Sequence, residues 1–266
     1  MSALASFYRE REQILLGGGF ILLLILLWQS IPFWISLPKG ISLFFTTPAE
    51  VAKAFYQLVV RNEIQGHIYV SAVEFIVGLA LAILVGLPLG LVMGRSKILD
   101  AMLDPFVTAF NATPRLIFLP LLMLWLGIGI WSKIMIVFVG AVFPLLINTY
   151  EGVKNADRVL VNVVRSFGAN EWQTMKTVVL PSSVPYIVAG LRLAIGRALL
   201  GVVVGEFFGA SKGLGFMIAT AATNYKVDVV FVGVAIFMGL SLILTMSVKK
   251  IESKLTRWRP ETVKNF

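Results

Sequence analysis

Several polar side chains interrupt apolar stretches of this 266-residue chain, and their types suit the binding of an anion. Asn111, Thr113 and Arg115 cluster around a proline, and Arg197 lies in a later apolar stretch. An arginine guanidinium binds carboxylate, sulfonate or nitrate oxygens through paired N–H donors. Polar groups inside a membrane are costly and mark a solute pathway by default. These four residues are therefore the predicted lining of a pathway for a small anion.

Each arginine also has a structural interpretation. Arg115 can clamp two helices together, and Arg197 can pair with a carboxylate. A third arginine in these stretches, Arg192, can extend its charge to the membrane surface or tether a nearby polar loop. Arg197 is the most deeply placed of the three, so it is the strongest candidate for contact with a solute.

Two acidic residues and one histidine lie near the ends of apolar stretches. Glu206 is predicted to belong to an outer gate or to its packing. Ser71 and Glu74 have the spacing of a capping box, which predicts a helix start; selection of an unusual solute is the alternative role for Glu74. His67 is interpreted as a helix-start or interface residue. With one histidine and no cysteine in the chain, no metal site is expected.

The elements that carry these residues are predicted membrane spans. Hydrophobic residues make up 58% of the chain and the mean hydropathy is +0.88, which is too apolar for a soluble domain of this length. A helix needs about 20 residues to cross the hydrocarbon core. Six stretches qualify and predict one all-α transmembrane domain: 14–34, 70–93, 105–127, 131–150, 183–208 and 228–248.

Glycine and proline within these stretches predict irregular helices at 86–88, at 112–114 and at Pro120, because proline removes a backbone hydrogen bond. Irregular backbone inside a membrane persists only where it is buried in protein or lines a wet cavity. Such breaks would suit helices that switch between two arrangements.

The distribution of positive charge predicts the orientation in the membrane. Most of the 23 lysine and arginine residues fall in segments on the same side as both termini, and cationic loops resist translocation. Both termini and the polar segment 151–181 are therefore expected in the cytoplasm. The basic tail 249–260 is expected to attract anionic lipid, and topology explains the net charge of +9 better than nucleic-acid binding does. The first span is too long for a signal-peptide core and is expected to be retained.

The polar segment 151–181 predicts two short helices with a sharp joint. One apolar stripe marks the first helix, on Val159, Leu160, Val163, Val164 and Phe167. Gly168 is expected to end this helix, because glycine lacks a Cβ. Asn170, with Gln173 three residues later, predicts the N-cap of the second helix, which Pro181 is expected to end.

Two further elements are expected outside the bilayer. Thr47 and Glu50 form a capping box with proline at the first helical position, which predicts an amphipathic helix on the outer interface. Residues 209–215, reading GASKGLG, predict a glycine-rich outer loop. The chain contains no G-x-x-x-x-G-K-[ST] phosphate loop, so it is not expected to hydrolyse ATP by itself.

The spacing from Gly168 to Val178-Val179-Leu180-Pro181 resembles the cytoplasmic signature of ABC-importer membrane subunits. Three more stretches resemble the type I permeases associated with nitrate, sulfonate, taurine and bicarbonate: VGLPLGLVMG at 85–94, FNATPRLIFLPLLMLWLGIG at 110–129 and VVVGEFFGASKGLGFMI at 202–218. In that family an acid is common at the position of Glu206, whereas many relatives have arginine where this chain has Glu74.

The resemblance implies a type I ABC-importer permease with cytoplasmic coupling helices, in a bacterial or archaeal inner membrane. It implies a homodimer, two ATP-binding cassette ATPase subunits that carry ATP and Mg, an extracytoplasmic substrate-binding protein, and no cofactor or catalytic site on this chain. The residues expected to meet the ATPase surround the joint: Arg165, Ser166, Phe167, Gly168, Ala169, Glu171 and Trp172.

Two other functional classes remain as alternatives. An ion-coupled secondary carrier working without an ATPase would need buried acids in relay positions, and the candidates are Glu74 and Glu206. An intramembrane hydrolase would need a nucleophile with a base or paired zinc ligands, for which the lone His67 is poorly suited. The solute stays open among nitrate, alkanesulfonates, aromatic carboxylates and vitamin-like heterocycles.

Overall fold

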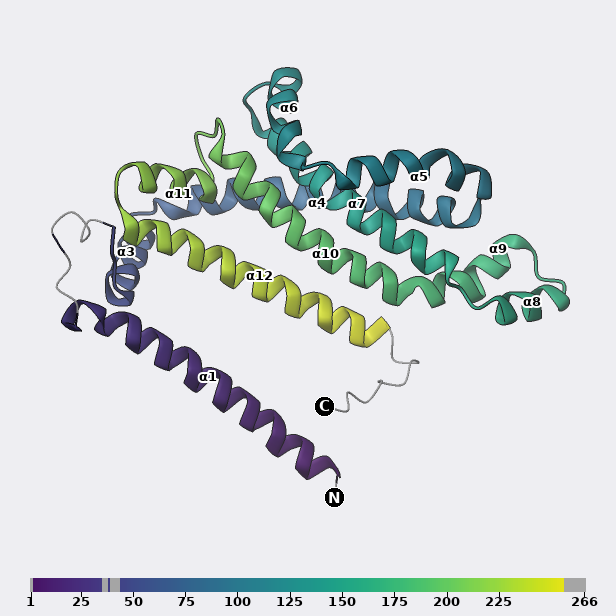
Figure 1. Ribbon diagram of the computed structural model, residues 1–266, viewed down its shortest axis with the longest axis horizontal. Coiled ribbons are helices and arrows are strands. Elements are labelled where there is room, and N and C mark those ends of the chain that lie inside the picture. Colours follow the sequence, from purple (N-terminus) through teal and green to yellow (C-terminus); the bar gives the residue numbers. More distant parts are fainter. Residues whose placement is uncertain (1, 35–37, 39–43, 256–266) are drawn as a thin grey trace. The chain divides into compact units, whose positions relative to one another are not determined.

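The computed structural model describes residues 2–34, 38 and 44–255, and most of these lie in helices (Figure 1). The helices, in chain order, are α1 (Ser2–Trp34), α3 (Pro48–Val60), α4 (Ile64–Arg95), α5 (Lys97–Ala112), α6 (Phe118–Leu126), α7 (Ile130–Lys154), α8 (Arg158–Ser166), α9 (Glu171–Thr174), α10 (Leu180–Phe207), α11 (Leu214–Thr223) and α12 (Val227–Leu255). A 3₁₀ turn over Arg115–Ile117 precedes α6, and a π-helix over Met175–Val179 joins α9 to α10. The predicted basic tail continues past residue 255, and that part lies outside the described residues.

Among the described residues, five helices are long and apolar enough to cross a membrane: Leu15–Trp34, Ile64–Arg95, Ile130–Lys154, Glu171–Phe207 and Val227–Leu255. A sixth candidate is the pair Lys97–Ala112 and Arg115–Leu126, which is bent by 87°. The bend falls at Thr113, whose backbone is extended (φ −72°, ψ 133°) because the following proline disfavours the helical region. The break predicted at 112–114 is therefore confirmed.

The irregularity predicted at 86–88 and at Pro120 does not break a helix. Helix α4 continues through Pro88, and α6 continues through Pro120. Pro120 lies in the first turn of its helix, where a missing N–H costs little. Pro88 lies well inside α4, between Gly86 and Gly90, which both pack closely against α7.

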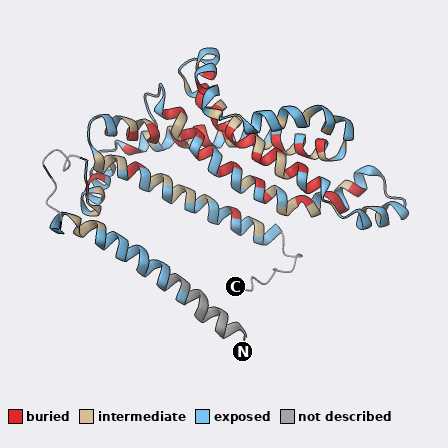
Figure 2. Ribbon diagram, in the orientation of Figure 1, coloured by how far each residue is buried: buried red, intermediate tan, exposed pale blue. Residues whose placement is uncertain are grey.

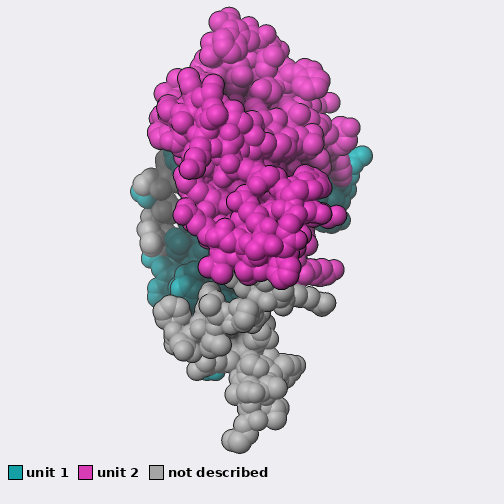
Figure 3. Space-filling model, turned by 90° about the vertical axis from the view of Figure 1, so that its right-hand side faces the viewer, with its two compact units in different colours: residues 1–64, 217–234 teal, residues 65–216, 235–266 magenta. Residues whose placement is uncertain are grey.

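The chain divides into two compact units, Met1–Ile64 with Met217–Val234 and Gln65–Phe216 with Ala235–Phe266, which Figure 3 shows in two colours. In the first unit, the Trp28 indole donates to the Thr46 carbonyl at 2.8 Å, and its ring lies 4.9 Å from that of Phe231. The predicted capping box at the start of α3 is confirmed. The Thr47 amide donates to the Glu50 carboxylate at 2.8 Å and holds the pKa of Glu50 below its ordinary value of 4.5. Organisation as a single membrane domain stays a prediction.

In the second unit, α4 packs against α7 through a stripe of small residues. Every fourth residue is small along this face of α4: Gly78, Ala82, Gly86, Gly90 and Gly94. A Cβ on Gly90 would lie 2.6 Å from the Leu146 carbonyl oxygen, and one on Gly94 would lie 2.6 Å from Val153 Cβ. Small residues at this spacing let two helix backbones approach closely, which is a common basis of helix association in membranes.

Helix α7 is also in close contact with α10, on which two candidate site residues lie. Buried residues concentrate on these two helices (Figure 2), among them Val137, Ala141 and Leu145 of α7 with Ala194 and Ala198 of α10. Glycines on both helices bring the backbones together: a Cβ on Gly140 would lie 3.1 Å from the Arg197 carbonyl oxygen. This packing holds α10, and therefore the backbone of Arg197 and Glu206, in a defined place beside α7.

Candidate functional site

A cavity of about 280 Å³ lies beside the break between α5 and α6. Its polar lining consists of Asn111, Thr113, Arg115 and Arg197, which are the four residues predicted to line a pathway. The bend between α5 and α6 places Asn111 and Arg115 beside Arg197 of α10 in the lining of one cavity. In a straight span, Arg115 would lie further along the helix axis. The remaining wall is apolar or backbone, from Ala112, Pro114, Leu116, Ile136, Gly140, Leu200, Gly201 and Val204.

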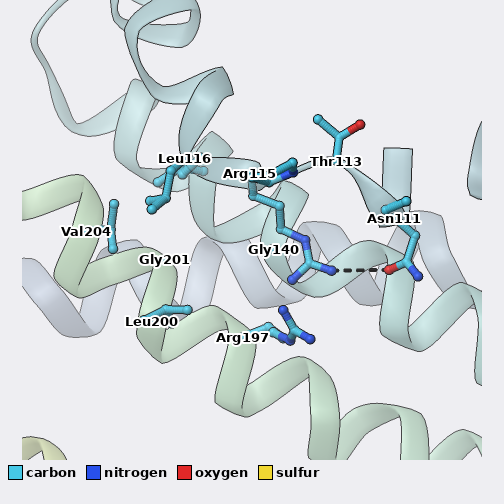
Figure 4. A pocket seen from close by; sticks show the side chains of 12 residues that line it. Asn111, Thr113, Arg115, Leu116, Gly140, Arg197, Leu200, Gly201 and Val204 are labelled. Atoms are coloured by element: carbon cyan, nitrogen blue, oxygen red, sulfur yellow. Dashed lines mark hydrogen bonds between the residues drawn. The ribbon is translucent and has the colours of Figure 1, made fainter. Parts of the chain in front are cut away.

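The two arginines of the cavity face each other across it (Figure 4). Arg115 Nη2 donates to Asn111 Oδ1 at 3.2 Å, whereas the Nε of Arg115 is buried and has no hydrogen-bond partner. The charge of Arg197 is close enough to act on Arg115. The described residues that line the cavity include no aspartate or glutamate, so its electrostatics favour an anion.

Two other polar residues of these spans, Thr113 and Arg192, have their partners outside the arginine pair. The Thr113 side chain points away from the arginines in Figure 4, and its hydroxyl donates to the Ala109 carbonyl at 2.8 Å. Arg192 does not line the cavity and forms an ion pair with Glu252 of α12. Neither structural alternative predicted for Arg192 anticipated this pair. The glycines that shape the wall, Gly140 and Gly201, were missed, because only polar residues were considered as candidates.

A second candidate site is the segment 158–174, hereafter the elbow, which consists of α8, the joint at Gly168 and α9. Asp157 caps α8 by accepting from the Val159 amide at 2.7 Å. Gly168 follows the helix with φ +84°, in the left-handed region that favours glycine. Asn170 and Gln173 form the predicted capping box at the start of α9. The two helices and their joint are therefore confirmed.

The elbow exposes apolar side chains. None of the residues of α8 is buried, and Val159, Phe167 and Trp172 are exposed by 68%, 87% and 73%. The apolar stripe predicted for the first helix therefore has no cover within the described chain. Exposed apolar surface of this kind is typical of interaction sites.

Two of the residues predicted to meet an ATPase already hold the elbow in place. Glu171 accepts from Arg165 at 2.7 Å, and it also pairs with Arg95 at the end of α4. These pairs link α8 and α9 to the end of a long helix. Arg165 and Glu171 thus act at least partly within the chain, whereas Phe167 and Trp172 remain open for contact.

The prediction that Pro181 ends the second helix of the elbow is wrong. The backbone continues from α9 through the π-helix into α10, and Glu171–Phe207 forms one span candidate of 37 residues. Pro181 lies in the first turn of α10, where its missing N–H is tolerated. The π-helix over Met175–Val179 precedes it and keeps the backbone continuous from α9 to α10.

A third cluster surrounds the first turn of α11 and contains Glu206. Three successive backbone N–H groups at this helix start each meet a distant side chain: Gly213 N donates to His67 Nδ1 at 3.0 Å, Leu214 N to Ser71 Oγ at 2.8 Å and Gly215 N to Glu206 Oε2 at 2.5 Å. Ser71 Oγ donates in turn to Glu206 Oε1 at 2.6 Å. We call these six residues the cap cluster.

The cap cluster corrects the predicted role of Ser71 and Glu74. They do not form a capping box at a helix start, because α4 begins at Ile64 and both residues lie within it. Ser71 instead helps to cap a different helix, more than a hundred residues later in the chain. Glu206 is buried and hydrogen-bonded, so its position is that of a packing residue; its role in a gate stays a prediction.

Comparison with known proteins shows which class of protein combines these features. Residues 86–257 match the family described as binding-protein-dependent transport system inner membrane component, and the chain belongs to this family. It is thus the multi-pass inner-membrane permease component of a binding-protein-dependent ABC importer, without a catalytic site or cofactor of its own. The family implies an ATPase and a binding protein as partners.

Two relatives with named substrates are similar to this chain over most of its length. The chain is 35% identical over 213 residues to the putative aliphatic sulfonates transport permease protein SsuC of Bacillus subtilis, which covers 80% of this chain and 77% of the relative. It is 29% identical over 255 residues to the taurine transport system permease protein TauC of Escherichia coli, covering 94% and 92%. Among solved structures, a chain of the inward-facing MetNI methionine ABC transporter matches with a TM-score of 0.63 at 19% identity, covering 76% of this chain and 98% of that chain. This likeness confirms the predicted permease fold.

Proposed function

We propose that this permease moves a small organic oxyanion of the sulfonate or taurine class, and that the arginine cavity is part of its pathway. The cavity combines two guanidinium groups with an amide and an apolar wall. A sulfonate has the matching chemistry, because its three oxygens accept paired N–H donors while its organic part lies against the apolar wall. The similarity to permeases named for aliphatic sulfonates and taurine supports the same class.

The observation that carries this proposal is the buried, unpartnered Nε of Arg115 opposite Arg197. A buried donor without a partner is costly, about 1–3 kcal/mol and more for a charged group. An anion between the two guanidinium groups would satisfy that donor and reduce the repulsion between them. A cationic solute would meet two like charges instead, so the cavity selects against cations.

The elbow is the proposed contact with the ATPase, on the cytoplasmic side together with both termini. Its exposed apolar side chains would lie in the groove of an ATPase subunit, and α10 would carry the motion to Arg197 along one continuous helix. Two copies of this chain with two ATPase subunits would form the transporter, and an extracytoplasmic binding protein would deliver the solute. Access would alternate as the packed helices switch between two arrangements.

The test is uptake by proteoliposomes that contain this chain with its partner ATPase and binding protein. Arg197→Met should reduce taurine or alkanesulfonate uptake at least about tenfold, since a hydrogen bond to a charged group contributes roughly 1.5–3 kcal/mol. Arg192→Met is the matched control, because Arg192 lies on the same helix outside the cavity and its ion pair with Glu252 is partly exposed. Unchanged uptake by the Arg197 variant, or an equal loss in the control, would remove Arg197 from the pathway.

A further inference from the structure

Glu206 uses both of its carboxylate oxygens as hydrogen-bond acceptors. Oε1 accepts from Ser71 Oγ at 2.6 Å, and Oε2 accepts from Gly215 N at 2.5 Å. Both oxygens act as acceptors, which suits the ionised form of Glu206. Its negative charge lies at the start of α11, where the helix dipole favours it.

A second carboxyl group lies directly against the first. Glu74 lies three residues after Ser71 on the same face of α4, which brings its carboxyl group beside Glu206, and each of the two glutamates is only 1% exposed. The Oε2 atom of Glu74 is buried and has no hydrogen-bond partner. Two adjacent carboxylates repel each other strongly where water is excluded, so this contact needs a proton between them or a compensating charge.

The charged and titratable groups around the pair supply only part of that compensation. Lys133 of α7 is 5% exposed and acts on both carboxyl groups, and its Nζ donates to the Gly129 carbonyl at 3.2 Å. His67 of α4 accepts at Nδ1 from Gly213, which is the behaviour of a neutral imidazole at that nitrogen. Lys212 in the loop before α11 is exposed. Two carboxyl groups thus face one buried ammonium group, which leaves one negative charge to be balanced.

We propose that Glu74 and Glu206 form a buried proton-binding site, in which protonated Glu74 donates to the Glu206 carboxylate and thereby keeps the cap cluster closed. With one proton bound, two carboxyl groups and Lys133 together carry no net charge. When the proton leaves Glu74 for solvent, a second negative charge appears beside Glu206. The repulsion then opposes the position in which Glu206 accepts from Ser71 and Gly215, and the start of α11 loses its cap.

The first test asks whether the proton is present. Infrared difference spectra of the purified full-length chain in lipid nanodiscs should show the C=O band of a protonated carboxyl group at neutral pH. Glu74→Gln should remove this band, because glutamine has no carboxyl group. Glu63→Gln is the control, since Glu63 is an exposed acid outside the cluster, and it should leave the band unchanged. Absence of the band in the wild-type chain, or its persistence in Glu74→Gln, overturns the assignment.

The second test asks what the proton controls. Hydrogen-exchange protection of the amides of residues 213–215 should fall about tenfold in the wild-type chain as pH rises, as expected for loss of a hydrogen bond to a charged group. Glu74→Gln keeps a donor at this position without a titratable proton, so its protection should not fall with pH. Equal pH profiles for the two proteins overturn the proposed control of the cap. Neither test uses a solute or an ATPase, so both are independent of the proposed anion pathway.

Discussion

The elbow and the cap cluster both cap the start of a helix, but with different kinds of partner. In each, the chain turns into a helix through a glycine with positive φ, +84° at Gly168 and +125° at Gly213. A Cβ on Gly168 would meet no atom within 4 Å, whereas one on Gly213 would lie 2.2 Å from Glu206 Oε1. The elbow caps its helix with a neighbouring side chain, and the cap cluster uses three distant ones.

The two regions therefore differ in how much of their own surface the chain covers. The three backbone N–H groups at the start of α11 are satisfied by side chains of the same chain, of which Ser71 and Glu206 are buried. The elbow leaves Val159, Phe167 and Trp172 exposed around an open joint. Its geometry is fixed by local capping and by Glu171, while its apolar surface stays exposed.

The largest expected effect is that of Gly213→Ala. Both the positive φ and the contact with Glu206 oppose a side chain here, and together they should cost about 3 kcal/mol or more of stability. Gly127→Ala is the control for backbone strain alone, because Gly127 has φ +79° with nothing within 4 Å, and it should lose less, about 1–3 kcal/mol. Denaturation of the purified proteins in detergent measures both. Equal losses would show that the cap cluster adds no steric constraint.

Ser71→Ala should have the second-largest effect, a loss of about 2–3 kcal/mol of stability. The substitution removes a buried donor to Glu206 and a buried acceptor for Leu214 N. Ser183→Ala is the matched control. Ser183 is equally buried, but its hydroxyl donates only to the Val179 carbonyl four residues earlier. The same denaturation experiment should give a smaller loss for Ser183, and a similar loss for both would contradict the importance of long-range capping.

Gly168→Val should have the smallest effect on the isolated chain, roughly 1–2 kcal/mol, because the joint is open and only backbone strain opposes the side chain. Gly127→Val also introduces a side chain at a positive φ with open space around it, but outside the elbow, and serves as the control. The two variants should differ in co-purification with the ATPase, which Gly168→Val should abolish and Gly127→Val should retain. Full co-purification of Gly168→Val would contradict the elbow as the ATPase contact.

The elements that were predicted correctly are those set by neighbouring residues. Asn170 with Gln173 and Thr47 with Glu50 cap their helices through contacts three residues apart, and Gly168 ends a helix because of its own backbone freedom. These signals lie within one turn of chain, so the residue pattern alone is sufficient to find them. The same holds for the break before Pro114.

Features that depend on distant parts of the chain were missed. Ser71 and Glu74 match a capping box in spacing, but the helix already begins at Ile64, and the partners of Ser71 are brought to it only by folding. Arg192 finds Glu252 sixty residues later for the same reason. The stripe of small residues on α4 was readable at every fourth position, yet a search for long apolar runs gives no weight to residue size.

The stripe on α4 also restricts how that helix can move. Because a small residue recurs every fourth position from Gly78 to Gly94, sliding α4 along α7 by four residues, about 6 Å at about 1.5 Å per residue, would place the next small residue at each contact. An intermediate displacement would press larger side chains against the backbone of α7. The pair therefore has discrete registers, and a transport cycle that shifts it would advance in steps of four residues.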